Sequence, residues 1–427
     1  MPKESIAVQR LQPGLYIELP LKWNEHPFLM AKFRLKDDGQ ISIIRQLGLK
    51  EVWYYPEKSQ GEPKPEAVED SSDAANELDA TPEEVKSQWE KKEELAATLR
   101  RRRQQIQQVE GQYNDTVDDV KALMSKMGSA PVQAMNEATK VVGAIVATLS
   151  ADKEVLVQLM NANNLDDSLY FHVLNVSVLA LLVAKEIGIE DKEQLMALGL
   201  AALLHDIGHV KLPSQLLRKT TPLNKPEFEL YMRHVRFATE MIAQHAKLKL
   251  TIKPLLLTLI DQHHVFLDGS GYPATIAPDK VHQLSKVLAI VNYYDELCNH
   301  NDPLQSLTPH EALSAMFSKQ SAKFDKQILQ ALVKMLGIYP PGTVVQLSDE
   351  SFAMVIYLNR KELLRPGVMM YSAEVPKQEA VIIDLADQSE LTIRKSLRPA
   401  QLSAEVFEYL SPRQRVSYFF ALKEGDK

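Results

Sequence analysis

Apolar and polar residues change their pattern several times along the chain, and each change marks a change of structure. Residues 1–56 carry short apolar runs separated by turn residues, which predicts a small β-rich N-terminal domain. Within it we expect a short helix over 41–47 and a closing strand over 51–55. Residues 57–80 are rich in Glu, Asp, Ser and Pro and have almost no large apolar side chains, so they are expected to form an acidic flexible linker.

A heptad pattern follows the linker. The segment Thr81-Pro82-Glu83-Glu84 combines a capping hydroxyl, a first-turn proline and acidic residues at the positive end of the helix dipole, so it predicts a helix start. Apolar residues then recur at a spacing of seven to about Met127, with an interruption at Lys92. We therefore expect a long helical stalk over 81–128, a coiled coil, and a homodimer formed through residues 83–127.

Helical periodicity dominates residues 131–337, where apolar residues are spaced three and four apart and strand signals are nearly absent. After a Tyr-Pro-Pro-Gly turn at 339–342, short apolar runs predict strands, and a helical tail is expected near 403–410. The sequence thus predicts a mainly α protein. A helical domain over 131–337 follows the N-terminal domain and stalk, and a C-terminal β appendage with its tail occupies 338–427.

Composition narrows the class of protein. An apolar content of 45% and a charged content of 25% are those of an ordinary soluble protein. The net charge of −7 argues against a surface for nucleic acid polymers. The single cysteine, Cys298, excludes an intramolecular disulfide and fits a reducing compartment. No signal segment is present, and the longest apolar stretch, 176–184, is too short to cross a membrane, so we expect a cytoplasmic protein with no membrane span.

The histidines concentrate in the helical region, where ten of the eleven fall within residues 172–310. His205 and Asp206 are adjacent in LLHDIGHVKLP, and a carboxylate can bridge two cations while an imidazole holds one. Further imidazoles are offered by His172, His234, His263 and His264. Each alone is more often structural than functional. So many together are hard to explain as core, because buried neutral imidazoles need partners, and a metal site is predicted.

A glycine-rich loop, Asp268-Gly269-Ser270-Gly271-Tyr272-Pro273, follows the histidine pair directly. HD at 205–206 and GYP at 271–273, inside HHVFLDGSGYP, resemble the HD-GYP branch of the HD phosphohydrolases over about 150–372. The N-terminal LQPGLYIELPLKWNEHPF resembles the small domain that often precedes HD-GYP domains in bacteria. The resemblance implies an all-α, metal-dependent domain that hydrolyses cyclic di-GMP to pGpG and often to GMP. It also implies protein partners such as diguanylate cyclase domains.

Residue by residue, the resemblance implies that Asp206 bridges two metals and, with His209, contributes to catalysis. The implied metal ligands are His172, His205, Asp206, His234, His263, His264 and Asn292, and the implied substrate loop is Asp268, Gly269, Gly271, Tyr272 and Pro273. We expect two divalent transition metals, Fe or Mn, with Ni or Zn as alternatives, because mixed imidazole and carboxylate ligands suit these ions.

The sequence also departs from the family pattern. Asn292 replaces an aspartate ligand and brings no charge, His209 replaces a lysine, and Ser168 stands where members with three metals carry a glutamate. Segment 300–305 lacks the family's phosphate-binding cations, and 265–266 lacks its charged pair.

Two hypotheses therefore stay open. The leading one is a cyclic di-GMP phosphodiesterase of bacterial second-messenger signalling, supported by the retained histidines and the glycine-rich loop. The alternative is a degenerate HD-GYP domain with little or no activity that binds a nucleotide or a protein, and the departures favour it.

Overall fold

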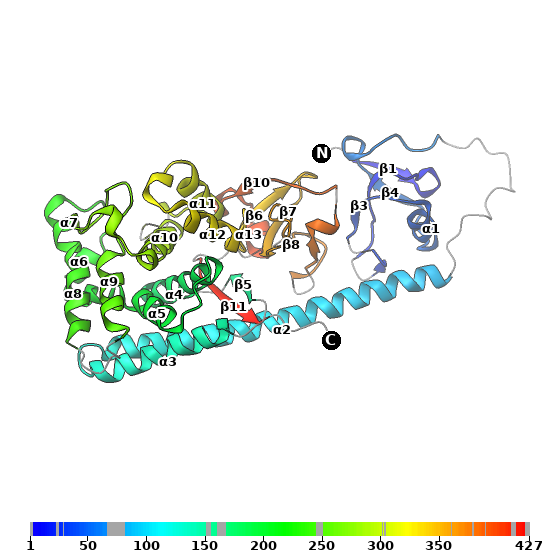
Figure 1. Cartoon of the computed structure of the whole chain (residues 1–427). Coiled ribbons are helices and arrows are strands. Elements are labelled where there is room, and N and C mark those ends of the chain that lie inside the picture. Colours follow the sequence, from blue (N-terminus) through cyan, green and yellow to red (C-terminus); the bar gives the residue numbers. More distant parts are fainter. Residues whose placement is uncertain are drawn as a thin grey trace. The chain divides into compact units, whose positions relative to one another are not determined.

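The chain is mainly helical, as the sequence predicts, and it divides into two compact units that are treated separately below. The first contains Met1–Gln105, Leu347–Phe352 and Met369–Ile383, and the second contains the remainder (Figure 1). The computed structural model describes residues 3–22, 25–28, 30–65, 82–150, 155–159, 168–244, 251–300, 302, 305–359, 361–377, 380–388, 390–410 and 416–422.

The first unit contains the predicted small β-rich domain. Its antiparallel sheet has the strand order β1-β4-β2-β3. The strands are β1 (Glu4–Ala7), β2 (Tyr16–Glu18), β3 (Lys32–Arg34) and β4 (Glu51–Tyr54). Helix α1 (Asp38–Gln46) begins earlier than predicted, because the Asp37 carboxylate accepts a hydrogen bond from the Gln40 N–H at 2.9 Å and so caps the helix there.

The predicted stalk is one helix, α2 (Pro82–Lys126). Lys92, which interrupts the heptads, is buried in the first unit and donates a hydrogen bond to the His26 carbonyl at 2.6 Å. Farther along, the heptad residues pack into the core of the second unit, with Tyr113 and Val120 completely buried. The apolar seam from Val109 to Met127 is therefore covered by the chain itself.

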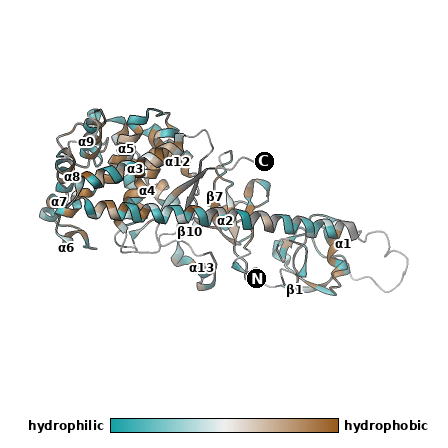
Figure 2. Ribbon diagram, turned by 90° about the horizontal axis from the view of Figure 1, so that it is seen from below, coloured by the Kyte–Doolittle hydropathy of each residue, from teal (hydrophilic) through white to brown (hydrophobic). Residues whose placement is uncertain are grey.

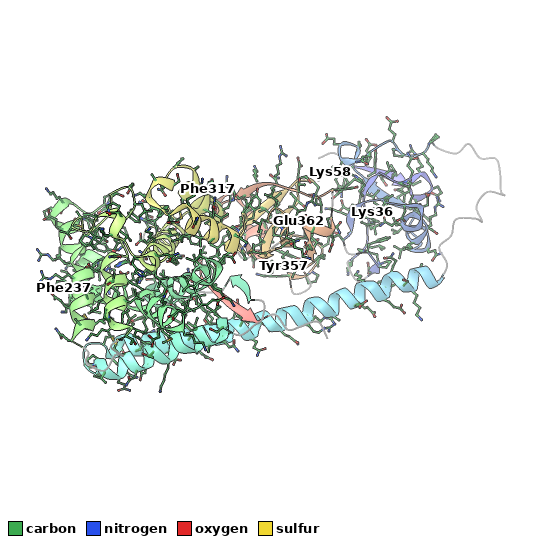
Figure 3. The ribbon with its side chains drawn as sticks, viewed as in Figure 1. Lys36, Lys58, Phe237, Phe317, Tyr357 and Glu362 are labelled. Carbon is green, nitrogen blue, oxygen red and sulfur yellow. The ribbon has the colours of Figure 1, made fainter. Side chains whose placement is uncertain are left out.

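The second unit is built around α4 (Ser168–Glu186), which is buried along most of its length. By length and composition α4 could span a membrane, but its burial identifies it as a core helix. Figure 2 shows apolar ribbon concentrated in α4 and its neighbour α5 (Lys192–Leu204). The surrounding helices are α3 (Pro131–Ser150), α6 (Ser214–Leu217), α7 (Lys225–Tyr231), α8 (Arg233–Ala243), α9 (Lys253–Gln262), α10 (Gln283–Cys298), α11 (Pro309–Ser318) and α12 (Lys326–Leu336). On α11, Phe317 stays exposed at the outer surface (Figure 3).

The C-terminal β appendage is present as a five-stranded sheet of order β10-β6-β7-β8-β9. Its strands are β6 (Val344–Leu347), β7 (Phe352–Tyr357), β8 (Gly367–Met370), β9 (Ile382–Asp384) and β10 (Ile393–Leu397). The predicted helical tail is α13 (Ala404–Leu410).

One strand pair was not predicted. β5 (Val155–Leu159) lies inside the region read as helical, and β11 (Tyr418–Leu422) follows the predicted tail helix. The two strands pair antiparallel, with Tyr418 opposite Leu159. The two strands lie far apart in the sequence, so local periodicity gives no sign of the pair.

Candidate metal centre

Asp206 lies where α5 gives way to the short 3-10 helix η5 (Ile207–Lys211). The chain can pack there only with glycine at position 208, because a Cβ on Gly208 would lie 2.0 Å from the His234 carbonyl oxygen of α8. This close approach brings the Asp206 carboxylate to 3.4 Å from Nε2 of His234. The Ile-Gly after the His-Asp pair thus allows Asp206 to approach His234 on α8.

Two sets of ligand atoms converge on Asp206, and within each set the atoms lie within 4.8 Å of one another. One set consists of Asp206, His234, His263 and His264, and the other of His172, His205 and Asp206. These residues come from or directly follow α4, α5, α8 and α9. The structure therefore brings together the histidines and the aspartate that the sequence singled out, with Asp206 shared between both sets.

Backbone carbonyls fix the orientation of three of these imidazoles. The Nδ1 atoms of His205, His234 and His263 lie 2.8, 2.8 and 2.6 Å from the carbonyl oxygens three residues earlier. A carbonyl only accepts hydrogen bonds, so each Nδ1 carries the proton and each Nε2 presents a lone pair to the interior.

The inward lone pairs face one another. Nε2 of His234 lies 3.5 Å from Nε2 of His263, and Nε2 of His172 lies 3.3 Å from Nε2 of His205. Burial lowers the pKa of His234 and lowers that of His263 well below the usual value, so both rings are neutral at pH 7. Two neutral acceptors at this distance repel each other unless a cation lies between or beside them. The donor set therefore fits a divalent metal of the kind that imidazole and carboxylate bind.

Electrostatics within the cluster favour an ionised Asp206. Burial alone would raise the pKa of Asp206, but the surrounding imidazoles, His205 and His209 foremost, hold it well below its usual value. Nδ1 of His209 lies 3.6 Å from the carboxylate, and its buried Nε2 has no hydrogen-bond partner among the described residues. His209 thus lies at the centre, as its place in the sequence predicts.

Asp295 lies on α10, three residues after Asn292, and from the sequence it could be considered only as a substitute ligand for the aspartate that Asn292 replaces. His172 Nδ1 donates to Asp295 Oδ2 at 2.5 Å, so Nε2 of His172 is directed toward Asp206 at 3.7 Å. Burial alone would lower the pKa of His172, but the surrounding carboxylates, Asp295 foremost, together raise it. A carboxylate behind a ligating imidazole fixes its tautomer and increases its basicity.

Asn292 lies one turn before Asp295 and is 2% exposed. Its Nδ2 donates to Glu296 Oε1 at 2.9 Å, while its buried Oδ1 has no hydrogen-bond partner in the described part of the chain. The Glu296 side chain is open to solvent, yet the protein around it raises its pKa to about 7. Glu296 was missed, although its spacing of four from Asn292 on a helix could have indicated the contact.

The glycine-rich loop packs against the second ligand set. The ring of Tyr272 lies 4.4 Å from that of His264, and the Tyr272 N–H donates to the His264 carbonyl at 3.0 Å. Gly271 has φ +90°, and a Cβ there would lie 2.0 Å from the same carbonyl oxygen. Asp268, by contrast, accepts hydrogen bonds from the backbone and hydroxyl of Ser270 and therefore shapes the loop.

Two other positions that depart from the family pattern, Ser168 and segment 300–305, have ordinary structural roles. Ser168 is the first residue of α4. In segment 300–305 the described side chains of Asp302 and Gln305 bond each other at 3.1 Å, and this part of the segment offers no cation.

Comparison with known proteins gives two domain matches. A family described as "HD domain" matches residues 146–328, and a domain of unknown function, DUF3391, matches residues 3–138. The chain is similar to a cyclic di-GMP phosphodiesterase of Pseudomonas aeruginosa, with 27% identity over 90% of each chain.

It is also similar, at 26% identity, to a cyclic di-GMP phosphodiesterase response regulator of Xanthomonas campestris; the match covers 37% of this chain and 41% of that protein. Among solved structures, an HDG"Y"P protein from Bdellovibrio bacteriovorus shares 17% identity at a TM-score of 0.41, covering 78% of this chain and 99% of the other.

Proposed function

We propose that this chain, whose residues 146–328 match the HD-domain family, is a metal-dependent phosphodiesterase of the HD-GYP type that hydrolyses cyclic di-GMP to pGpG and GMP. The observation that carries the proposal is the inward-facing pair of neutral Nε2 atoms, 3.5 Å apart, beside an ionised carboxylate. Such a centre suits hydrolysis of a phosphodiester, whose negative charge it would compensate.

We assign one metal to His172, His205 and Asp206 and a second to Asp206, His234, His263 and His264, with Asn292 as a neutral additional ligand of the first. Iron or manganese is the expected pair, and nickel or zinc are alternatives. Bound there, the cations would activate water as the nucleophile and neutralise charge on the phosphate.

The side chains around the metals would have separate roles in catalysis and substrate binding. Asp206 supplies the negative charge shared by both ligand sets. His209 lies beside it, and its buried Nε2, which has no hydrogen-bond partner in the part of the chain that the structure describes, is assigned to proton handling or phosphate contact. The loop of Asp268, Gly269, Gly271, Tyr272 and Pro273 would form one wall of the substrate pocket, with the ring of Tyr272 in tilted contact with that of His264.

The alternative remains a degenerate domain that binds a nucleotide or a protein, such as a diguanylate cyclase domain, without turnover. It is favoured by the uncharged Asn292 and by the lack of a cation in the described part of segment 300–305. We also propose a cytoplasmic homodimer formed through the stalk. Because the apolar seam from Val109 to Met127 is covered within the chain, the dimer contact would use the part of α2 before Val109.

The test combines elemental analysis of the purified protein with chromatography of cyclic di-GMP incubated with Mn²⁺ or Fe²⁺. About two metals per chain with pGpG or GMP as product would support the phosphodiesterase. Bound metal without product at high enzyme concentration would favour the binding module. Cyclic di-AMP serves as the control substrate, because its turnover at an equal rate would contradict specificity for guanine.

A further inference from the structure

The C-terminal segment 416–418 is bound by two asparagine side chains of the helical core. Asn299, directly after α10, donates from Nδ2 to the Val416 carbonyl at 2.8 Å and accepts from the Val416 N–H at 2.8 Å. Asn175 on α4 accepts from the Tyr418 N–H at 2.7 Å. The two side-chain amides therefore form hydrogen bonds with the backbone N–H and C=O groups of the segment, as the backbone of a neighbouring strand would.

The same two amides hold Asp295. Asn299 Nδ2 lies 2.9 Å from Asp295 Oδ1, and Asn175 Nδ2 donates to the same oxygen. The other carboxylate oxygen accepts from His172. A continuous chain of hydrogen bonds thus runs from the backbone at 416–418 through two amides and one carboxylate to an imidazole of the first ligand set.

A purely structural role for the asparagines does not account for this arrangement. The segment is already held in place without the asparagines, since Tyr418 is fully buried. The Tyr418 hydroxyl also lies 3.1 Å from that of Tyr294. Asp295 is 1% exposed, and a buried carboxylate is costly unless hydrogen bonds satisfy it. The amides satisfy one oxygen, so the other is left to orient His172.

We propose that the C-terminal segment 416–418 is a positioning element of the metal centre. It fixes Asn175 and Asn299, these fix Asp295, and Asp295 sets the tautomer and direction of His172. Displacement of the segment, for example by a binding partner, would weaken the metal held by His172 and leave the His234, His263 and His264 set intact. The inference rests on the proposed metal centre and adds a route for its regulation.

The experiment measures Mn²⁺ affinity of the full chain by calorimetry and needs no turnover. Asn299→Ala removes all three hydrogen bonds of the amide and should weaken one of two Mn²⁺ sites on the order of tenfold, as is usual for partners behind a metal ligand. Asn299→Ser is the second variant, since its short polar side chain cannot reach both Val416 and Asp295. Tyr418→Phe is the matched control, because it loses a hydrogen bond of the same segment outside the relay and should bind Mn²⁺ normally.

A double-mutant cycle decides whether Asn299 acts through Asp295. In an Asp295→Asn background, Asn299→Ala should cause no further loss of Mn²⁺ affinity. Additive losses, or an equal loss in Tyr418→Phe, would overturn the relay. Normal Mn²⁺ binding without phosphodiesterase activity would contradict only the proposed reaction, whereas a wild-type chain that binds no Mn²⁺ would contradict the centre and the relay together.

Discussion

Nδ1 of His172 lies 2.5 Å from Oδ2 of Asp295, so a candidate metal ligand is held from behind by a buried carboxylate. Both carboxylate oxygens of Asp295 are engaged in hydrogen bonds, so this geometry places Asp295 behind His172 and not beside Asp206 as a further ligand. The two polar residues of this helix face therefore have different partners. Asp295 accepts a hydrogen bond from the His172 imidazole, and Asn292 donates one to Glu296.

Asp206→Ala should abolish metal binding and any hydrolysis, because it removes the carboxylate shared by both ligand sets. Elemental analysis of the purified variant checks the metal content. Asp268→Ala is the acidic control, since Asp268 bonds within its own loop, and it should keep its metal. If the Asp206→Ala variant keeps the wild-type metal content, the assignment of the metal centre is wrong.

Asn292→Asp should raise the affinity for the first metal, because a carboxylate adds a full charge near the cation. The gain should be larger in a Glu296→Gln background, where the new aspartate no longer faces a second carboxylate across the contact that now measures 2.9 Å. Titration with Mn²⁺ of the two single variants and the double variant measures both effects. Equal affinity in all of them would mean that Asn292 does not face the metal.

Gly208→Ala should destabilise the helical unit and lower metal occupancy, because the added methyl group would lie 2.0 Å from the His234 carbonyl and force η5 away from α8. Gly143→Ala on α3 is the matched control: beyond the helix's own backbone, no atom of the described residues lies within 4 Å of its Cβ position, and alanine should stabilise the helix by about 1 kcal/mol. Thermal unfolding with parallel metal analysis distinguishes the two. Full occupancy in Gly208→Ala would show that the approach of η5 to α8 is not required.

The stability of the N-terminal unit should fall in mild acid because of His26. Burial and the nearby Lys92 ammonium lower the pKa of His26 from 6.5 to about 4. The unfolded chain therefore binds the proton first, so the stabilisation is complete above pH 6.5 and is lost as the pH falls toward 4, by roughly 2–3 kcal/mol. All three tryptophans lie before residue 90, so their fluorescence reports this unit alone. His26→Gln should remove the pH dependence, and an unchanged dependence would assign it to another group.

Residues whose side chains are typical metal ligands could be predicted from the sequence. Imidazoles next to a carboxylate identified the site, and periodicity identified the helices that carry them. The supporting residues could not be predicted in this way. Asn175 is one polar position in an apolar run, and Asn299 bonds the backbone of a segment more than a hundred residues away, for which no local pattern exists. Similarly, α1 started earlier than its apolar residues indicated because a capping carboxylate, and not hydrophobicity, sets its first turn.

The pairing of β5 with β11 affects when the centre can form during synthesis. The ribosome makes His172 and Asp206 long before it makes residues 416–418, whose backbone completes the hydrogen bonds of Asn175 and Asn299. A nascent chain in which residues 416–418 have not yet left the exit tunnel therefore has the candidate ligands but not their support. Completion of the candidate metal centre would therefore wait for residues 416–418, and metal loading would distinguish chains that contain this segment from those that stop short of residue 416.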